Sequence, residues 1–239
     1  MDAIILLSSG MDSVTSLWWA RNWYNKLYTI TFQYGIKEER VSIKCAKRLS
    51  DMVSATHNII ALPWLGEFSK YAGSTLVTGK KVPQPDEESL DNLEKASMTA
   101  KSVWIPARNL VFLSVATSFA ESLQSEEPID IITGFDKEEA VTFPDNSKRF
   151  IENFNATIEF ATFKKEIKVV CPLIENNKTE IIKTGITLDV PFEYSNSCYE
   201  PQGIDEHGHP IHCGKCESCM RRKRAFREAG IEDPTVYIG

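Results

Sequence analysis

In the first part of the chain, runs with the apolar pattern of strands alternate with segments whose apolar side chains have helical spacing. The run 3–7 is continuously apolar, which is typical of a strand buried on both faces of a parallel sheet. Residues 14–21 then carry apolar side chains at helical spacing. A second strand at 27–32, a charged amphipathic helix at 38–52 and a third strand at 55–62 follow. This βαβαβ order predicts a mononucleotide-binding α/β fold with a parallel sheet.

An irregular middle separates this unit from a second run of alternating elements. Residues 71–97 contain glycines and prolines followed by an acidic stretch. We expect a long loop there, either a solvated surface insertion or a flap over the active site. Beyond it, the apolar spacing predicts helix 109–123, strand 129–133, helix 147–163, strand 167–171, helix 178–184 and a basic helix 220–229. We therefore expect an α/β domain at 1–190 and a small C-terminal subdomain at 191–239.

Composition narrows the class of protein. The 239 residues are 42% hydrophobic and 25% charged, which excludes a mainly disordered or fibrous chain. No apolar stretch reaches the roughly 18 residues of a membrane-spanning helix. The run 3–7 is too short for a signal peptide, so we expect a cytoplasmic protein. The net charge of −6 argues against broad electrostatic binding of nucleic acid.

The turn after the first strand is a candidate phosphate site. It has the sequence Ser-Ser-Gly-Met-Asp-Ser at 8–13, where backbone N–H groups and the positive end of a helix converge. Gly10 allows close backbone approach, Ser8 and Ser13 supply hydroxyl groups, and Asp12 can hold magnesium. The dinucleotide and Walker fingerprints are absent, so neither hydride transfer nor a common γ-phosphate-cleaving NTPase is favoured. A purely structural turn is the alternative.

The six cysteines divide unevenly along the chain. Cys45 and Cys171 are isolated, and we expect both to be buried small side chains. The other four gather near the C-terminus, namely Cys198, Cys213, Cys216 and Cys219. Tetrahedral zinc takes four such ligands at about 2.3 Å, and zinc would stabilise a segment with little core of its own. The alternatives are a zinc site of three cysteines with His212, an iron–sulfur cluster or a redox thiol pair. Outside such a zinc site, we expect His207, His209 and His212 at the surface.

These motifs carry a family resemblance. The turn at 8–13 resembles the SGGxDS pyrophosphate loop of the N-type ATP pyrophosphatases, with Ser9 at a glycine position, where serine restricts φ. The whole chain resembles the QueC family. The further matching motifs are Phe32-Gln33-Tyr34-Gly35, Ile105-Pro106-Ala107-Arg108-Asn109, Gly134, Phe143-Pro144-Asp145, Asn177-Lys178-Thr179-Glu180 and Ser197-Cys198-Tyr199 with the terminal CxxCxxC.

The resemblance implies a fold, a reaction and its cofactors. The fold would be adenine nucleotide alpha hydrolase-like (HUP/Rossmann-like) with a zinc-binding subdomain. The reaction would convert 7-carboxy-7-deazaguanine and ammonia to 7-cyano-7-deazaguanine, using ATP, Mg²⁺ and Zn²⁺, for queuosine or archaeosine synthesis. The resemblance suggests a homodimer, and from the acidic charge balance we expect no direct contact with nucleic acid. ATP would contact Leu7, Ser8, Ser9, Gly10, Met11, Asp12, Ser13, Val14, Thr15, Ser16, Leu17 and Lys178.

The resemblance also implies roles for individual residues. The expected catalytic residues are Asp12, Lys178 and Arg108, and the expected substrate contacts are Arg108, Asn109, Phe143 and Asp145. Lys178 would stabilise charge as the adenylate forms, although a solvated lysine at a helix start is the alternative. Arg108 suits a carboxylate or phosphate. Asp145 would accept hydrogen bonds from a guanine-like N–H edge, or cap the next helix; Asn109 has the same capping alternative.

Two stretches depart from the family pattern, and two other functions remain open. Many family members have Cys-Arg where this chain has Asn146-Ser147, and Gln-x-His where it has Ile36-Lys37-Glu38.

One rival function is that of a related enzyme that joins the deazaguanine carboxylate to another amine or protein as an amide. The other is a zinc-ribbon nucleic-acid-binding protein, suggested by Arg221, Arg222, Lys223, Arg224 and Arg227; a solvated helix is the simpler explanation for that run.

Overall fold

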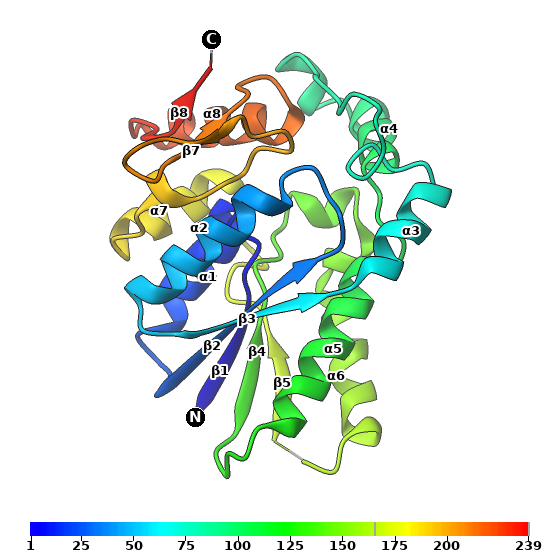
Figure 1. Cartoon of the computed structure of the whole chain (residues 1–239), viewed down its shortest axis with the longest axis vertical. Coiled ribbons are helices and arrows are strands. Elements are labelled where there is room, and N and C mark those ends of the chain that lie inside the picture. The colour runs from blue at the N-terminus through cyan, green and yellow to red at the C-terminus, as the bar shows by residue number, and fades with distance from the viewer. Residues whose placement is uncertain (165, 239) are drawn as a thin grey trace.

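The centre of the computed structural model, which describes residues 1–164 and 166–238, is a parallel five-stranded sheet (Figure 1). The strand order is β3-β2-β1-β4-β5, so β1 lies in the middle of the sheet. All neighbouring pairs are parallel. The strands are β1 (Asp2–Leu6), β2 (Lys26–Gln33), β3 (Thr56–Ala61), β4 (Ile129–Ile132) and β5 (Ile167–Val170). The predicted α/β class and parallel sheet are confirmed.

Helices cover both faces of this sheet. Ala3 and Ile5 of β1 pack on one side, and Ile4 packs on the other, which explains the continuous apolar run of this strand. The first face is covered by α1 (Met11–Ala20), α2 (Glu39–Met52) and α7 (Lys178–Thr187), and the second by α5 (Arg108–Ser122) and α6 (Lys148–Ala161) (Figure 1). Each of these helices lies within a few residues of its predicted position.

The middle segment differs from the expected loop. It contains a 3₁₀ helix at Glu88–Leu90 and the start of α4 (Leu93–Ser102), preceded by α3 (Pro63–Tyr71). It is also anchored, because Leu76, Val82 and Leu90 are buried. Ion pairs join it to the C-terminal helix α8 (Glu217–Ala229): Arg224 to Asp91 at 2.6 Å, and Arg227 to Glu87. A simple solvated insertion is therefore wrong, and the flap function stays a prediction.

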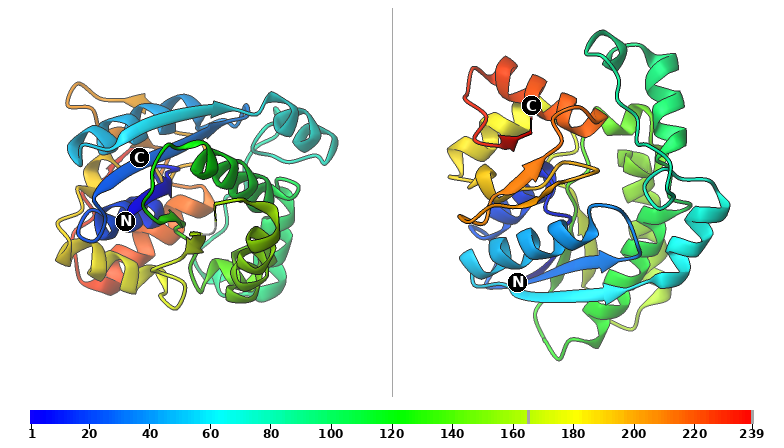
Figure 2. Two further views of the ribbon diagram at one scale, coloured as in Figure 1. Left: turned by 90° about the horizontal axis from the view of Figure 1, so that it is seen from below. Right: turned by 45° about the horizontal axis from the view of Figure 1, so that its top comes forward.

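The C-terminal part carries a second, small sheet in the order β6-β7-β8. Its strands are β6 (Gly203–Ile204), β7 (Pro210–His212) and β8 (Val236–Tyr237). Together with α8 it lies above the carboxyl ends of the main strands, opposite α3 and α4 (Figure 2). Phe226 of α8 packs edge-on against Phe192 in the core next to α1, so this part shares a core with the main sheet. The boundary at residue 190 stays a prediction.

Two expectations about polar side chains of this region are wrong. His212 lies on β7 and is buried, rather than at the surface. Arg222 of the basic run is also fully buried, and it donates to the Ser195 hydroxyl group at 2.8 Å and to the Phe192 carbonyl group at 3.0 Å. Among the described residues, no helix has the length and apolar character needed to cross a membrane.

Candidate active site

A pocket opens at the carboxyl ends of β1, β2 and β4. Since β1 pairs with β2 on one side and β4 on the other, this is the point where a parallel sheet forms a crevice for ligands. The turn 8–13 and Lys178 line one end, and aromatic residues line the other. The predicted residues Arg108, Asn109, Phe143 and Asp145 line the same pocket. The structure thus brings these predicted substrate contacts together with part of the predicted ATP contacts. The remaining predicted ATP contacts are buried and do not line the pocket, namely Ser9, Val14, Thr15, Ser16 and Leu17.

The turn 8–13 is held by hydrogen bonds between its own residues. The Ser13 hydroxyl group donates to the Gly10 carbonyl group at 3.0 Å, and the Ser8 and Ser13 hydroxyl oxygens lie 3.1 Å apart. Gly10 is the residue before α1, and its side of the turn faces the pocket. The remaining N–H groups of the first turn of α1 are therefore available to an anion.

Ser9 and Gly134 show how tightly this turn is built. Ser9 has a φ of 71°, the left-handed region that favours glycine, and its buried hydroxyl group has no partner. A Cβ atom at Gly134, just after β4, would lie 2.7 Å from the Ser13 nitrogen. Only glycine lets the end of β4 approach the start of α1 this closely.

Lys178 lies at the centre of a buried charge cluster. Its Nζ atom is 2.9 Å from Asp12, 2.8 Å from Asp136 and 2.8 Å from Glu139, and its side chain is 5% exposed. It is the first residue of α7, whose start is fixed by a capping box between Asn177 and Glu180. The alternative of a solvated lysine is therefore wrong.

The cluster perturbs the ionisation of its members. Burial alone would lower the pKa of Lys178, but the carboxylates of Asp12, Glu139 and Asp136 outweigh it and raise the pKa well above its usual value. Burial raises the pKa of Asp136 to about 7, against the opposing effect of Lys178. Three carboxyl groups thus surround one ammonium group, so the cluster has an excess of acidic groups.

A divalent cation fits this excess of carboxylates. Oxygen atoms of Asp12, Asp136 and Glu139 lie within 4.8 Å of one another, and Oδ1 of Asp12 is buried without a hydrogen-bond partner. Carboxylate oxygens are the ligands that Mg²⁺ prefers. Sequence reasoning found Asp12 but missed Asp136 and Glu139. Their position in the loop that follows the buried strand β4, at the carboxyl edge of the sheet, was the signal available for them.

The other end of the pocket is aromatic. The Phe32 and Phe112 rings are stacked at 3.9 Å, and the Trp104 and Phe143 rings are nearly parallel at 6.0 Å. These four rings line an aromatic slot, in which a flat heterocycle would pack against their exposed faces and edges.

Polar side chains interrupt this aromatic end. Arg108 begins α5, and burial would lower its pKa, but Tyr34, Asp145 and Glu139 outweigh this and raise it. On the neighbouring loop, burial raises the pKa of Glu38 to about 8. The aromatic end of the pocket therefore carries both a fixed positive charge and carboxyl groups.

The capping alternatives for Asn109 and Asp145 are wrong. Ala107 precedes α5, while the Asn109 side chain is buried and donates to the Asp145 carbonyl group at 3.3 Å. The cap of α6 is Ser147, which accepts a hydrogen bond from the Phe150 N–H group at 3.2 Å. Neither side chain is a helix cap, and both residues line the pocket.

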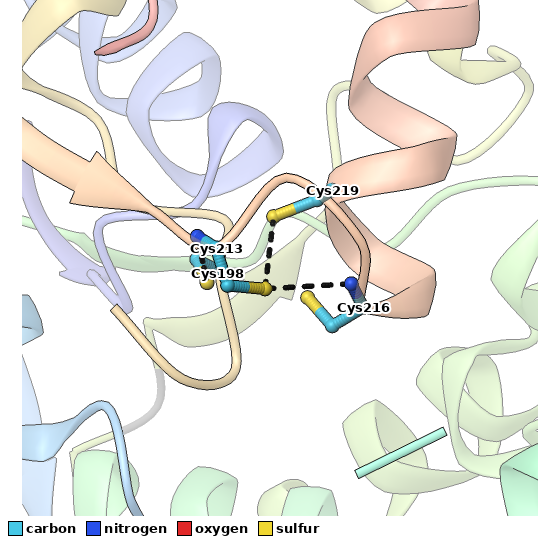
Figure 3. Close-up of side chains that lie close together, drawn as sticks. All are labelled: Cys198, Cys213, Cys216 and Cys219. Carbon is cyan, nitrogen blue, oxygen red and sulfur yellow. Dashed lines mark hydrogen bonds between the residues drawn. The ribbon is translucent and has the colours of Figure 1, made fainter. Parts of the chain in front are cut away.

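The four C-terminal cysteines converge on one point (Figure 3). Their sulfur atoms lie within 4.8 Å of one another and all four residues are buried. Backbone N–H groups of Cys213 and Cys216 donate to sulfur atoms of Cys198 and Cys213, at 3.3 and 3.4 Å. Such donors stabilise thiolates, so the donor set fits tetrahedral zinc. His212 is not part of this group, and the three-cysteine alternative with it is wrong.

The basic run of α8 is used within the protein. Arg221 pairs with Glu217 at 2.9 Å, Arg222 with Asp233 at 3.3 Å, and the Lys223 ammonium group donates to the Gly214 carbonyl group at 2.9 Å. Arg224 and Arg227 form the ion pairs described above, so each cation of this run has a partner within the protein.

Comparison with known proteins identifies a family for this chain. Residues 2–230 match the family described as queuosine biosynthesis protein QueC. A 7-cyano-7-deazaguanine synthase of Pyrococcus furiosus is 48% identical over 235 residues, covering 98% of this chain and 96% of that protein. A protein of the same description from Methanococcus maripaludis is 46% identical over 243 residues, covering 100% of this chain and 99% of that protein.

Proposed function

This chain belongs to the QueC family, and we propose that it converts 7-carboxy-7-deazaguanine and ammonia to 7-cyano-7-deazaguanine at the expense of ATP. The observation that carries the proposal is the joining of an anion-binding turn and an aromatic slot in one pocket, with Lys178 at the anion end. A flat aromatic acid in the slot would point its carboxylate toward a nucleotide bound at the turn. This arrangement suits adenylation of the acid.

The proposed reaction has two activation steps. A carboxylate oxygen attacks the α-phosphorus of ATP, the bond to the β-phosphate oxygen breaks and pyrophosphate leaves. Ammonia then attacks the acyl carbon and displaces AMP, which gives an amide and releases a proton. The amide oxygen is adenylated by a second ATP, and loss of AMP together with the remaining amide protons gives the nitrile. No side chain needs to act as a covalent nucleophile.

At the anion end, the chain provides donors for the leaving pyrophosphate. The first-turn N–H groups of α1 and the hydroxyl groups of Ser8 and Ser13 hold it. When bound, magnesium would neutralise phosphate charge, and Asp12, Asp136 and Glu139 would hold it. Carboxylates engaged in this way would release the Lys178 ammonium group toward the phosphates, where it stabilises the charge that develops during transfer.

At the aromatic end, we propose that Phe143 packs against the heterocycle and that Asn109 positions the 144–146 segment. The Arg108 guanidinium would face the substrate carboxylate or the α-phosphate. Zinc held by the four cysteines would fix the C-terminal part over the pocket. We also propose a cytoplasmic homodimer that acts on small molecules, without direct contact with nucleic acid.

An isotope experiment tests the adenylation chemistry. The acid is labelled with ¹⁸O in both carboxylate oxygens and incubated with the protein, ATP, Mg²⁺ and ammonium. The proposal predicts that each AMP gains one ¹⁸O atom and that unlabelled pyrophosphate is released. Label in inorganic phosphate, or AMP without label, would contradict it. A product that retains one ¹⁸O and carries an amide would favour the amide-forming relative.

A further inference from the structure

Glu38 is a carboxyl group in the pocket wall without a complete set of partners. It directly precedes α2, on the loop that follows β2. Its Oε2 atom is buried and has no hydrogen-bond partner. The neighbouring Glu39 differs, because it accepts a hydrogen bond from the Gly35 N–H group at 2.6 Å and another from the Gln33 amide at 3.2 Å. Glu39 thus closes the loop, whereas Glu38 remains available.

The surroundings of Glu38 are aromatic, so a planar ring could pack against them. Tyr34 and Phe32 precede it on the same chain segment, and Phe112 of α5 stacks on Phe32 within the same pocket. A buried carboxyl oxygen without a donor is unfavourable by itself. A ligand that brings N–H donors to this position would satisfy it, which explains why the fold can retain the group.

The other carboxyl group at this end is better satisfied. The backbone N–H group of Asn109 hydrogen-bonds to Asp145, and Arg108 acts on it electrostatically. Burial raises the pKa of Glu38 to about 8, and the Arg108 charge opposes this only in part. N–H donors supplied by a ligand would therefore stabilise the carboxylate form of Glu38. Of the two acids, Glu38 is the one with a buried carboxyl oxygen that has no hydrogen-bond partner.

The candidate ligands for Glu38 differ in the hydrogen-bond donors that they present. A 2-aminopyrimidin-4-one ring presents two adjacent donors, the N1–H and the 2-amino group, which match the two oxygens of one carboxylate. Adenine presents its amino group beside the N1 lone pair, which a carboxylate repels. Ammonia has no ring to fill the aromatic slot.

We propose that the Glu38 carboxylate accepts both hydrogen bonds from the aminopyrimidinone edge of the deazaguanine acid and so selects this heterocycle. The inference rests on the proposed function and assigns one residue to substrate selection within it. Glu38 is then a specificity-determining residue, distinct from the groups that act on phosphate.

The test combines a variant with a modified substrate. Pyrophosphate release by the full-length protein is measured for the wild type and Glu38→Gln, with the acid and with its analogue that lacks the 2-amino group. Glu67→Gln is the matched control, because Glu67 is exposed on α3, away from the pocket. The wild type should prefer the acid over the analogue by about 100-fold in kcat/KM. Glu38→Gln should lose most of this preference while keeping the KM for ATP and the thermal unfolding midpoint.

Each contrary result has its own meaning. If the wild type shows less than about threefold preference for the 2-amino group, the inference is wrong irrespective of any variant. It is also wrong if Glu38→Gln weakens both substrates equally, or raises the KM for ATP instead, as adenine recognition would require. If the wild type releases no pyrophosphate with the acid at all, the proposed function fails and the inference fails with it.

Discussion

The ammonium group of Lys178 lies 2.8 Å from the carboxylate of Asp136, and both side chains are buried. Lys178 begins the helix after β5, whereas Asp136 follows β4. Both therefore reach the carboxyl edge of the sheet, where Asp12 and Glu139 complete the cluster. Burying one cation and three acids costs free energy, and the fold could be stabilised without such a cluster. The cluster therefore indicates a role in binding charged ligands.

Replacing Lys178 should damage both stability and activity. Lys178→Ala leaves the carboxylates of Asp12, Asp136 and Glu139 without their cation, so we expect a loss of about 3–5 kcal/mol in the free energy of unfolding. Pyrophosphate release should fall at least 100-fold. Lys183→Ala, on the exposed side of the same helix, is the control for urea unfolding and activity. Added Mg²⁺ should restore part of the stability of Lys178→Ala but not its activity; an unchanged rate would remove Lys178 from the mechanism.

Ser9→Gly should stabilise the protein. The φ of 71° is strained for serine and free for glycine, and the substitution also removes a buried hydroxyl group without a partner. We expect a gain of about 1 kcal/mol in urea unfolding. Ser54 has a similar φ of 55° but is exposed, so Ser54→Gly reports the backbone contribution alone. A smaller gain at Ser9 than at Ser54 would mean that the Ser9 hydroxyl group is satisfied in solution.

Gly134→Ala should weaken nucleotide binding. The added methyl group would lie 2.7 Å from the Ser13 nitrogen and 2.8 Å from the Asp12 carbonyl carbon, so the start of α1 must move away from β4. We expect the KM for ATP to rise at least tenfold. Gly79→Ala is the control, since no atom lies within 4 Å of its added Cβ. Equal kinetics for the two variants would contradict a rigid phosphate site at this turn.

Removal of zinc should loosen the C-terminal part. We expect one zinc ion per chain by elemental analysis, lost in Cys219→Ser together with several degrees of the unfolding midpoint. Cys171→Ala should keep the metal, because Cys171 lies after β5, outside the group of four cysteines. Iron instead of zinc, or metal retained in Cys219→Ser, would contradict the assignment.

Much of the fold was predictable because the apolar pattern of each segment indicates its secondary structure. The apolar run 3–7 and the amphipathic spacing of 38–52 reflect burial that each segment undergoes by itself. The whole of α4 was missed because Leu93 and Met98 are exposed, so this helix has a weak apolar face.

The site was predictable only where a motif is contiguous. The turn 8–13 and the CxxCxxC run at 213–219 are such motifs, and Cys198 lies only fifteen residues before that run. The cluster around Lys178 depends on strand order, which places residues distant in sequence side by side. The burial of Arg222 likewise depends on acceptors from a distant loop, Phe192 and Ser195.

The product formed from 7-carboxy-7-deazaguanine tests the proposed function most directly. The purified protein is incubated with the acid, ammonium, ATP and Mg²⁺, and the product is identified by mass spectrometry while pyrophosphate is counted. We predict the nitrile, with two pyrophosphates and two AMP released for each molecule. An amide as the final product with one pyrophosphate, or no pyrophosphate that depends on the acid, would contradict the proposed function.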